Sequence, residues 1–287
     1  MIRIVTDTSA DITVSQAREM NVELVPLHIH FENKSYNPLQ DETFQIFYQM
    51  LEEAKTLPST SQPDPQSFLS IYESAKHAGD DVVVITLSNK VSGTFQSATL
   101  AKDLCDYDRI YVVDSLSAVI GQRLLIDFAV RKRAEGMDAP TIAQMVKEAA
   151  NHVVLFAGLD TLKYLRKGGR IPKSMEMIGT VIGLKPLIKL TDGAIVMAGK
   201  ARGRLGSIHA LLNLIVREKA INAKEMVYFG YTKSNEQCKI LQEKAIEKFN
   251  LLKTVCYPVG SVVGTHVGPG AFVIAYLPNF NGSVKNA

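Results

Sequence analysis

Short apolar runs alternate with longer amphipathic stretches through the first half of the chain, and this alternation limits the possible folds more than any other feature. Residues 82–85 are a continuous run of valine and isoleucine, which is typical of a buried strand. The stretch before them begins at Asp64-Pro65, an N-cap residue followed by a first-turn proline, and ends at Gly79. Strands that alternate with such helices predict βαβ crossovers and a largely parallel sheet.

The pattern changes near residue 158. Thr191-Asp192-Gly193 lies between two apolar runs and predicts a β-hairpin. Helical and strand-like segments alternate after it, up to Tyr276. The sequence therefore predicts an α/β protein with two domains: an N-terminal parallel-sheet α/β domain over residues 1–157 and a smaller mixed α/β domain over residues 158–287. A length of 287 residues agrees with two domains.

Charge and hydropathy exclude several classes of protein. The 32 basic and 29 acidic residues leave a net charge of +3, too small for a protein that coats nucleic acid, and no helix-turn-helix pattern supports a DNA-binding regulator. No apolar run approaches the roughly 20 residues of a membrane span, and the start of the chain does not resemble a signal peptide. We therefore expect a cytoplasmic protein. The cysteines are far apart in sequence and are expected to be free thiols: Cys105, Cys238 and Cys256.

No standard motif for nucleotide binding, a nucleophile elbow or a zinc protease is present. The six histidines are not spaced with carboxylates or thiols as a metal site requires. We therefore predict no metal, no cofactor and no catalytic residue of the chain's own. The remaining candidates are loops rich in hydroxyl groups and glycine at strand-to-helix junctions, where open parallel sheets bind their ligands.

Two hydroxyl-rich loops are the first candidates. Ser59, Thr60 and Ser61 precede the helix that starts at Asp64, and turn chemistry and ligand contact explain them equally well. Ser92-Gly93-Thr94 follows the buried run at 82–85 and opens the next helix. Its hydroxyls and free N–H groups suit a carboxylate or a phosphate, although a plain helix cap would use the same residues.

Basic and glycine-rich segments of the second half are further candidates. Arg170 follows two glycines at a predicted helix end, and Arg202 lies in a second basic cluster. Cations there are often only partners of a helix dipole or part of a solvated face. His266 lies in a predicted loop with Gly264, Gly268 and Gly270, which suggests a backbone held close to another group, and we expect a functional role for it.

Several motifs follow one another along the chain: Val5-Thr6-Asp7-Thr8-Ser9-Ala10-Asp11, Thr60-Ser61-Gln62-Pro63, Ser92-Gly93-Thr94, Val113-Asp114-Ser115, Lys167-Gly168-Gly169-Arg170-Ile171, Lys185-Pro186 and His266-Val267-Gly268-Pro269-Gly270. In this order they resemble the DegV family of bacterial fatty-acid-binding proteins, and the resemblance covers essentially the whole chain. The usual motif of that family is TSQPS, and in this chain Asp64 stands in place of its last serine, which changes only a helix cap.

The resemblance implies a two-domain DegV-like fold that encloses one long-chain fatty acid and serves as the lipid-binding subunit of a fatty acid kinase. A separate ATP-dependent subunit would convert the bound carboxylate to an acyl-phosphate for phospholipid synthesis. The residues are assigned by the same resemblance. Thr60, Ser92 and His266 would hold the carboxylate, Ser61, Gly93 and Thr94 would support them, and Arg170 and Arg202 would lie near the carboxylate or on the surface facing the kinase.

Burial of an acyl chain is energetically reasonable for such a protein. A chain of ~14–16 methylenes contributes on the order of 12 kcal/mol before ordering costs. Residues 175–184, rich in methionine and branched side chains, are predicted to line the tunnel together with the adjoining sheet. The alternative is a serine-dependent esterase or acyltransferase that uses Ser92 as nucleophile and His266 as base, although no carboxylate that would orient His266 is evident.

Overall fold

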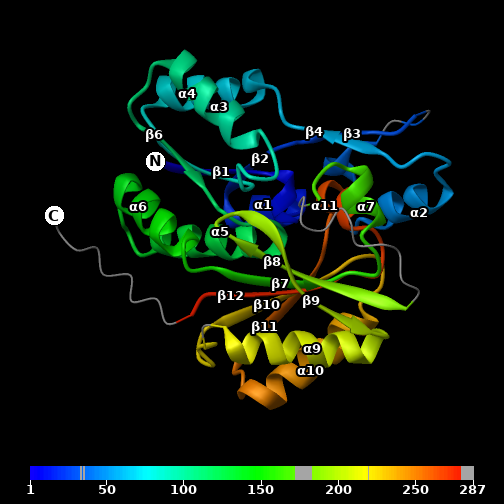
Figure 1. Ribbon diagram of the computed structural model, residues 1–287. Helices are drawn as coiled ribbons and strands as arrows, with labels where there is room; N and C mark the ends of the chain where they lie inside the picture. The colour runs from blue at the N-terminus through cyan, green and yellow to red at the C-terminus, as the bar shows by residue number, and fades with distance from the viewer. Residues whose placement is uncertain (33, 35, 172–182, 219, 279–287) are drawn as a thin grey trace.

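The computed structural model describes residues 1–32, 34, 36–171, 183–218 and 220–278. Its N-terminal sheet has four parallel strands, as the βαβ rhythm predicts (Figure 1). In spatial order they are β2 (Val22–Val25), β1 (Ile2–Asp7), β5 (Asp81–Thr86) and β6 (Ile110–Asp114). Helices α3 (Pro65–Ala78) and α4 (Thr94–Cys105) cover one face, and α1 (Val14–Met20), α5 (Val119–Ala134) and α6 (Ala139–Ala150) lie on the other.

The second sheet is mixed and has six strands. Only β10 and β11 are parallel neighbours, and the other pairs are antiparallel. Helices α9 (Arg204–Arg217) and α10 (Glu236–Phe249) cover its outer face (Figure 1). The strands in spatial order are β11 (Lys253–Pro258), β10 (Met226–Tyr231), β12 (Phe272–Tyr276), β7 (Val154–Gly158), β8 (Leu184–Thr191) and β9 (Ala194–Arg202).

Helix α5 is buried between the two sheets (Figure 1). Its side chains join one apolar core that includes Ile4 and Ile85 of the first sheet and Leu155 and Val273 of the second. The predicted boundary after residue 157 falls inside β7, a strand of the six-stranded sheet. The division at 157/158 stays a prediction, while the α/β class with a parallel N-terminal sheet and a mixed second sheet is confirmed.

Small elements gather beyond the carboxyl ends of β1 and β5. Strands β3 (His28–His30) and β4 (Ser59–Ser61) form an antiparallel pair there. Short helices belong to the same group: η1 (Thr8–Ala10), η2 (Pro38–Gln40), α2 (Gln45–Glu53), α7 (Lys163–Lys167) and α11 (Ser261–Val267). Of these, α7 and α11 pack against each other.

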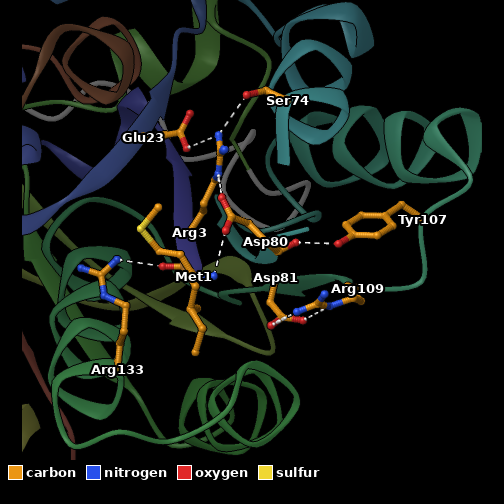
Figure 2. A network of polar contacts seen from close by, with 10 residues as sticks. Met1, Arg3, Glu23, Ser74, Asp80, Asp81, Tyr107, Arg109 and Arg133 are labelled. Carbon is orange, nitrogen blue, oxygen red and sulfur yellow. Dashed lines mark hydrogen bonds and ion pairs between the residues drawn. The ribbon is translucent and has the colours of Figure 1, made fainter. Parts of the chain in front are cut away.

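A separate polar network lies at the opposite, amino-terminal edge of the parallel sheet (Figure 2). The carboxylate of Asp80 accepts hydrogen bonds from the Met1 amino group at 2.8 Å and from Arg3 Nε at 2.9 Å. Asp81 forms a bidentate pair with Arg109, both contacts at 2.7 Å. The Asp80 contacts fix the start of β1 beside β5, and the Asp81–Arg109 pair joins the start of β5 to the residue before β6. The network therefore has a structural role distinct from the loops at the other edge.

Helix α6 begins with Asp138 as N-cap, because Pro140 in the first turn fits a helix start. One sequence prediction about local structure is wrong. His266 was predicted in a glycine-rich loop, yet it lies in the last turn of α11. Glycine is needed at position 264 inside that helix, because the rings of Phe47 and Tyr48 pack against it and leave no room for a side chain. Residues 175–182 of the predicted tunnel lining lie outside the described residues.

Candidate ligand-binding site

A largely apolar pocket lies between the two sheets, next to the start of α5. The space between its wall atoms is about 850 Å³, solvent at the open mouth included. Its polar lining residues are Thr60, Ser92, Arg170, Lys189 and His266. The rest of the wall is Leu27, Leu87, Val91, Ala118, Val119, Leu155, Ala157, Leu159, Leu165, Ile188, Leu190, Ile195, Val259, Val262, Val263, Val267, Ala271 and Val273.

Thr60 and His266 meet at this pocket although 206 residues separate them. The distance from Thr60 Oγ1 to His266 Nε2 is 2.7 Å. Alternate residues of a strand face opposite sides, and β4 follows this rule. Thr60 lines the pocket, whereas the exposed Ser61 bonds His30 Nε2 at 2.9 Å through its Oγ atom. Of these two predicted site residues, the structure brings only Thr60 to the pocket.

The imidazole of His266 is held by the glycines of two predicted motifs. Gly168, at the C-terminus of α7, lies so close to Nδ1 that a side chain at that position would collide with the ring. Gly268, which follows α11 at a φ of 72°, packs against the ring of Tyr164 in α7. The glycines therefore allow α7 and α11 to approach each other, which positions His266 toward Thr60.

The hydrogen-bond state of this pair decides what it offers a ligand. Nδ1 of His266 is buried and has no hydrogen-bond partner among the described residues. If the ring carries its proton on Nε2, Thr60 Oγ1 accepts that hydrogen bond and its own hydrogen is free for an acceptor in the pocket. The pair then presents one hydroxyl donor to an anionic oxygen.

Protonation of His266 is disfavoured in the folded protein, which gives a pH-dependent prediction. Burial, together with the nearby charge of Arg170, lowers the pKa of His266 to about 4. The unfolded chain takes up this proton near pH 6.5. Between these values the unfolded state binds more protons, so the free energy of unfolding should fall as pH falls from about 6.5 to about 4, by at most about 3 kcal/mol.

Chemical denaturation at a series of pH values measures this effect, with His266→Gln as the matched variant. Glutamine keeps a hydrogen-bonding side chain but does not titrate. The free energy of unfolding of the wild type should fall relative to that of the variant as pH falls across that window. Two parallel profiles would contradict a buried, neutral His266.

The Ser92 loop contributes one residue to the pocket wall. Ser92 Oγ lies 2.9 Å from Thr94 Oγ1 and accepts a hydrogen bond from the backbone N–H of Thr94 at 3.3 Å. Thr94 is buried and does not line the pocket, and Gly93 is in contact with the Gln62 side chain, which leaves no room for a Cβ atom. Gly93 and Thr94 therefore support Ser92 rather than contact a ligand.

The two predicted arginines lie in different surroundings. Arg170 lines the pocket, and its Nε donates to the Val91 carbonyl at 3.2 Å. Hydrogen bonds and close contacts link Thr60, His266, Gly168, Arg170 and the carbonyl of Val91, and Ser92 follows Val91 in the chain, so these residues form one polar cluster of the pocket wall. Arg202, at the end of β9, is exposed and does not line the pocket. Arg170 is half-buried in the pocket wall.

Most of the apolar wall was missed from the sequence. It comes from β7, β8, β12 and α11, whose inward side chains include Ala157, Ile188, Val273 and Val262. The alternation of Ile188 and Leu190 in a predicted strand, and the Val262-Val263 pair before His266, were available signals. The part of the chain that the structure describes contains no cluster of His, Cys, Asp and Glu that could hold a metal, and no helix in it is long and apolar enough to cross a membrane.

The fold and the pocket together define a class: α/β proteins with two sheets that hold a ligand pocket between them, apolar along its wall and polar at one cluster. The chain belongs to the DegV family, since the model described as "Uncharacterised protein, DegV family" matches residues 1–279. A DegV domain-containing protein of Clostridium acetobutylicum is 30% identical over 279 residues, which cover 97% of this chain and 99% of the relative. The predicted family resemblance is confirmed.

Solved structures are similar over the same length. A DegV family protein from Thermus thermophilus, described for its fatty acid binding, is 28% identical with a TM-score of 0.83, over 96% of this chain and 99% of that one. The Fatty Acid Kinase B3 protein of Streptococcus pneumoniae, loaded with linoleic acid, has a TM-score of 0.83 at 20% identity, again over 96% and 99%. This second likeness shows the shared fold.

Proposed function

We propose that this protein binds one long-chain fatty acid in the pocket and presents its carboxylate to a separate ATP-dependent kinase subunit. The observation that carries the proposal is the joining of a long apolar wall to one polar cluster of Thr60, Ser92, Arg170 and His266. An acyl chain gains free energy from burial along the wall, whereas an unpaired buried carboxylate would be very costly. The hydroxyls and the guanidinium provide partners for that head group.

Relatives support the choice of a fatty acid as ligand. The Thermus thermophilus protein is described as binding fatty acid, and the Streptococcus pneumoniae protein carries linoleic acid. The kinase partner rests on the family resemblance and on the description of the second protein as part of a fatty acid kinase. In this proposal the partner supplies ATP, the product is an acyl-phosphate that feeds phospholipid synthesis, and the protein works in the cytoplasm.

The ligand is tested on protein purified from an expression host. Native mass spectrometry should show the mass of one acyl chain bound per protein, and lipid extraction should release a long-chain fatty acid. The measurement is repeated after delipidation and incubation with a defined fatty acid such as oleate. A protein that carries no acyl chain and takes none up would overturn the proposal.

The rival function, a serine esterase or acyltransferase, is less consistent with the polar contacts. Its proposed base, His266, bonds Thr60, and the proposed nucleophile Ser92 lies beside Thr94. Among the described residues no carboxylate bonds Nδ1 of His266, so the orienting group of a triad is missing. Incubation with a serine-directed phosphonate distinguishes the two functions, because a hydrolase is labelled at Ser92 and a binding protein is not.

A further inference from the structure

Two thiols are in contact in the outer layer of the six-stranded sheet. Cys238 lies in the first turn of α10 and Cys256 lies in β11, and their Sγ atoms are 3.4 Å apart. The strand presents alternate residues to the helix, since Thr254 accepts a hydrogen bond at 2.9 Å from Gln242 of α10. Both cysteines are thus turned toward the same helix–strand interface, on the side of the sheet away from the pocket.

The two thiols differ in exposure and acidity. Cys238 is fully buried, whereas Cys256 is half-buried. The hydrogen bond from Cys238 and the charge of Lys239 lower the pKa of Cys256. The same contact, together with burial, raises the pKa of Cys238. The pair therefore consists of a half-buried thiol of lowered pKa in contact with a fully buried thiol, the arrangement of dithiols that react with disulfides.

We propose that Cys238 and Cys256 are a thiol modification site that reacts with low-molecular-weight disulfides to form an intramolecular disulfide. The Cys256 thiolate attacks one sulfur of the reagent RSSR, which breaks its S–S bond and releases RS⁻. Cys238 then loses its proton and attacks Cys256 Sγ, which releases the second RS⁻. The protons of the two thiols end on the two RSH molecules, and the two electrons taken from the protein reduce the reagent.

Little movement is needed for the second step. A contact of 3.4 Å must shorten to the ~2.05 Å of an S–S bond, a change that side-chain torsions can supply. The new bond would tie α10 to β11 and close the segment between residues 238 and 256. It should therefore raise the melting temperature of the oxidised protein. The proposal does not depend on a fatty acid ligand, because neither cysteine lines the pocket.

The probe is oxidised glutathione, applied to the folded full-length protein. Free thiols counted after denaturation should fall from the three of the sequence to one, Cys105. Mass spectrometry of a non-reduced digest should find the peptides of Cys238 and Cys256 joined, and dithiothreitol should reverse both changes. Retention of all three thiols, or a glutathione adduct on Cys256 that never resolves in the wild-type protein, would overturn the proposal.

Three variants assign the roles. Cys238→Ser should stop the reaction at a mixed disulfide that adds one glutathione to Cys256, and Cys256→Ser should leave Cys238 unreacted. Cys105→Ser is the matched control, because Cys105 is a buried cysteine of α4, on the opposite side of the molecule from α10 (Figure 1). It should form the disulfide as fast as wild type. A glutathione adduct that forms on Cys238 in Cys256→Ser as fast as the adduct on Cys256 in Cys238→Ser would contradict the assigned order of attack.

Discussion

Thr60→Val and Ser92→Ala should each weaken the retention of a fatty acid about 10- to 100-fold. Each change removes a hydroxyl from the pocket wall, and a hydrogen bond to a charged group contributes roughly 1.5–3 kcal/mol. Each 1.4 kcal/mol corresponds to about tenfold in the dissociation constant. The measurement is the dissociation constant of a defined fatty acid for delipidated protein, compared with the wild-type value.

Neighbouring substitutions separate this effect from a loss of folding. Thr60→Val also takes away the hydrogen-bond partner of His266 Nε2, so its melting temperature must be measured as well. Thr60→Ser keeps the hydroxyl and should restore affinity. Ser61→Ala is the matched control, because Ser61 lies on the same short strand but bonds His30 outside the pocket. Unchanged affinity in both Thr60→Val and Ser92→Ala would indicate that other residues, Arg170 or His266, bind the carboxylate.

Arg202→Ala should leave the bound fatty acid in place and slow acyl-phosphate formation by about tenfold. Arg202 is exposed at the end of β9 and does not line the pocket, so its charge is free to attract the phosphates or an acidic face of a kinase partner. The experiment pairs two measurements on each variant: the fraction of protein that carries lipid, and the rate of acyl-phosphate formation with an ATP-dependent fatty acid kinase subunit.

The control removes the same charge elsewhere. Arg217 is exposed at the far end of α9, and Arg217→Ala should turn over at the wild-type rate. Raised salt should slow acyl-phosphate formation with the wild-type protein more than with Arg202→Ala, because salt screens the attraction that the variant has already lost. A normal rate of acyl-phosphate formation in Arg202→Ala would show that its basic cluster is only a solvated surface and has no role with the kinase. Arg170→Ala cannot separate the two roles, since Arg170 lines the pocket and we expect its loss to weaken lipid retention as well.

The sequence was informative where a local signal determines the structure. Pro65 and Gly79 mark the two ends of α3, and the hairpin turn at Asp192-Gly193 joins β8 and β9 as predicted. His266 shows where local signals stop. Its glycines were interpreted as a loop, but their use depends on α7, about 100 residues away, because Gly168 makes room for the ring and Tyr164 packs on Gly268. Such packing has no sequence pattern of its own.

The site was predicted in the same uneven way. Motif resemblance identified four residues of the pocket wall, Thr60, Ser92, Arg170 and His266. Composition and turn chemistry alone could not distinguish Ser61 from Thr60, since the pairing of β4 with β3 decides which hydroxyl faces inward, whereas the resemblance assigned Thr60 to the carboxylate. The resemblance could not separate Arg170 from Arg202, because both lie in basic segments that contain glycine and only tertiary structure buries one of them.

The central position of α5 has a consequence for synthesis of the protein on the ribosome. By the time residue 134 has emerged, α5 can fold against β1 and β5, but β10 and β12, which cover its other side, follow only with residues 226–276. Until then the part of α5 that packs on β10 and β12 stays uncovered. The first half should therefore emerge with an exposed apolar surface, which favours aggregation until the second sheet is complete.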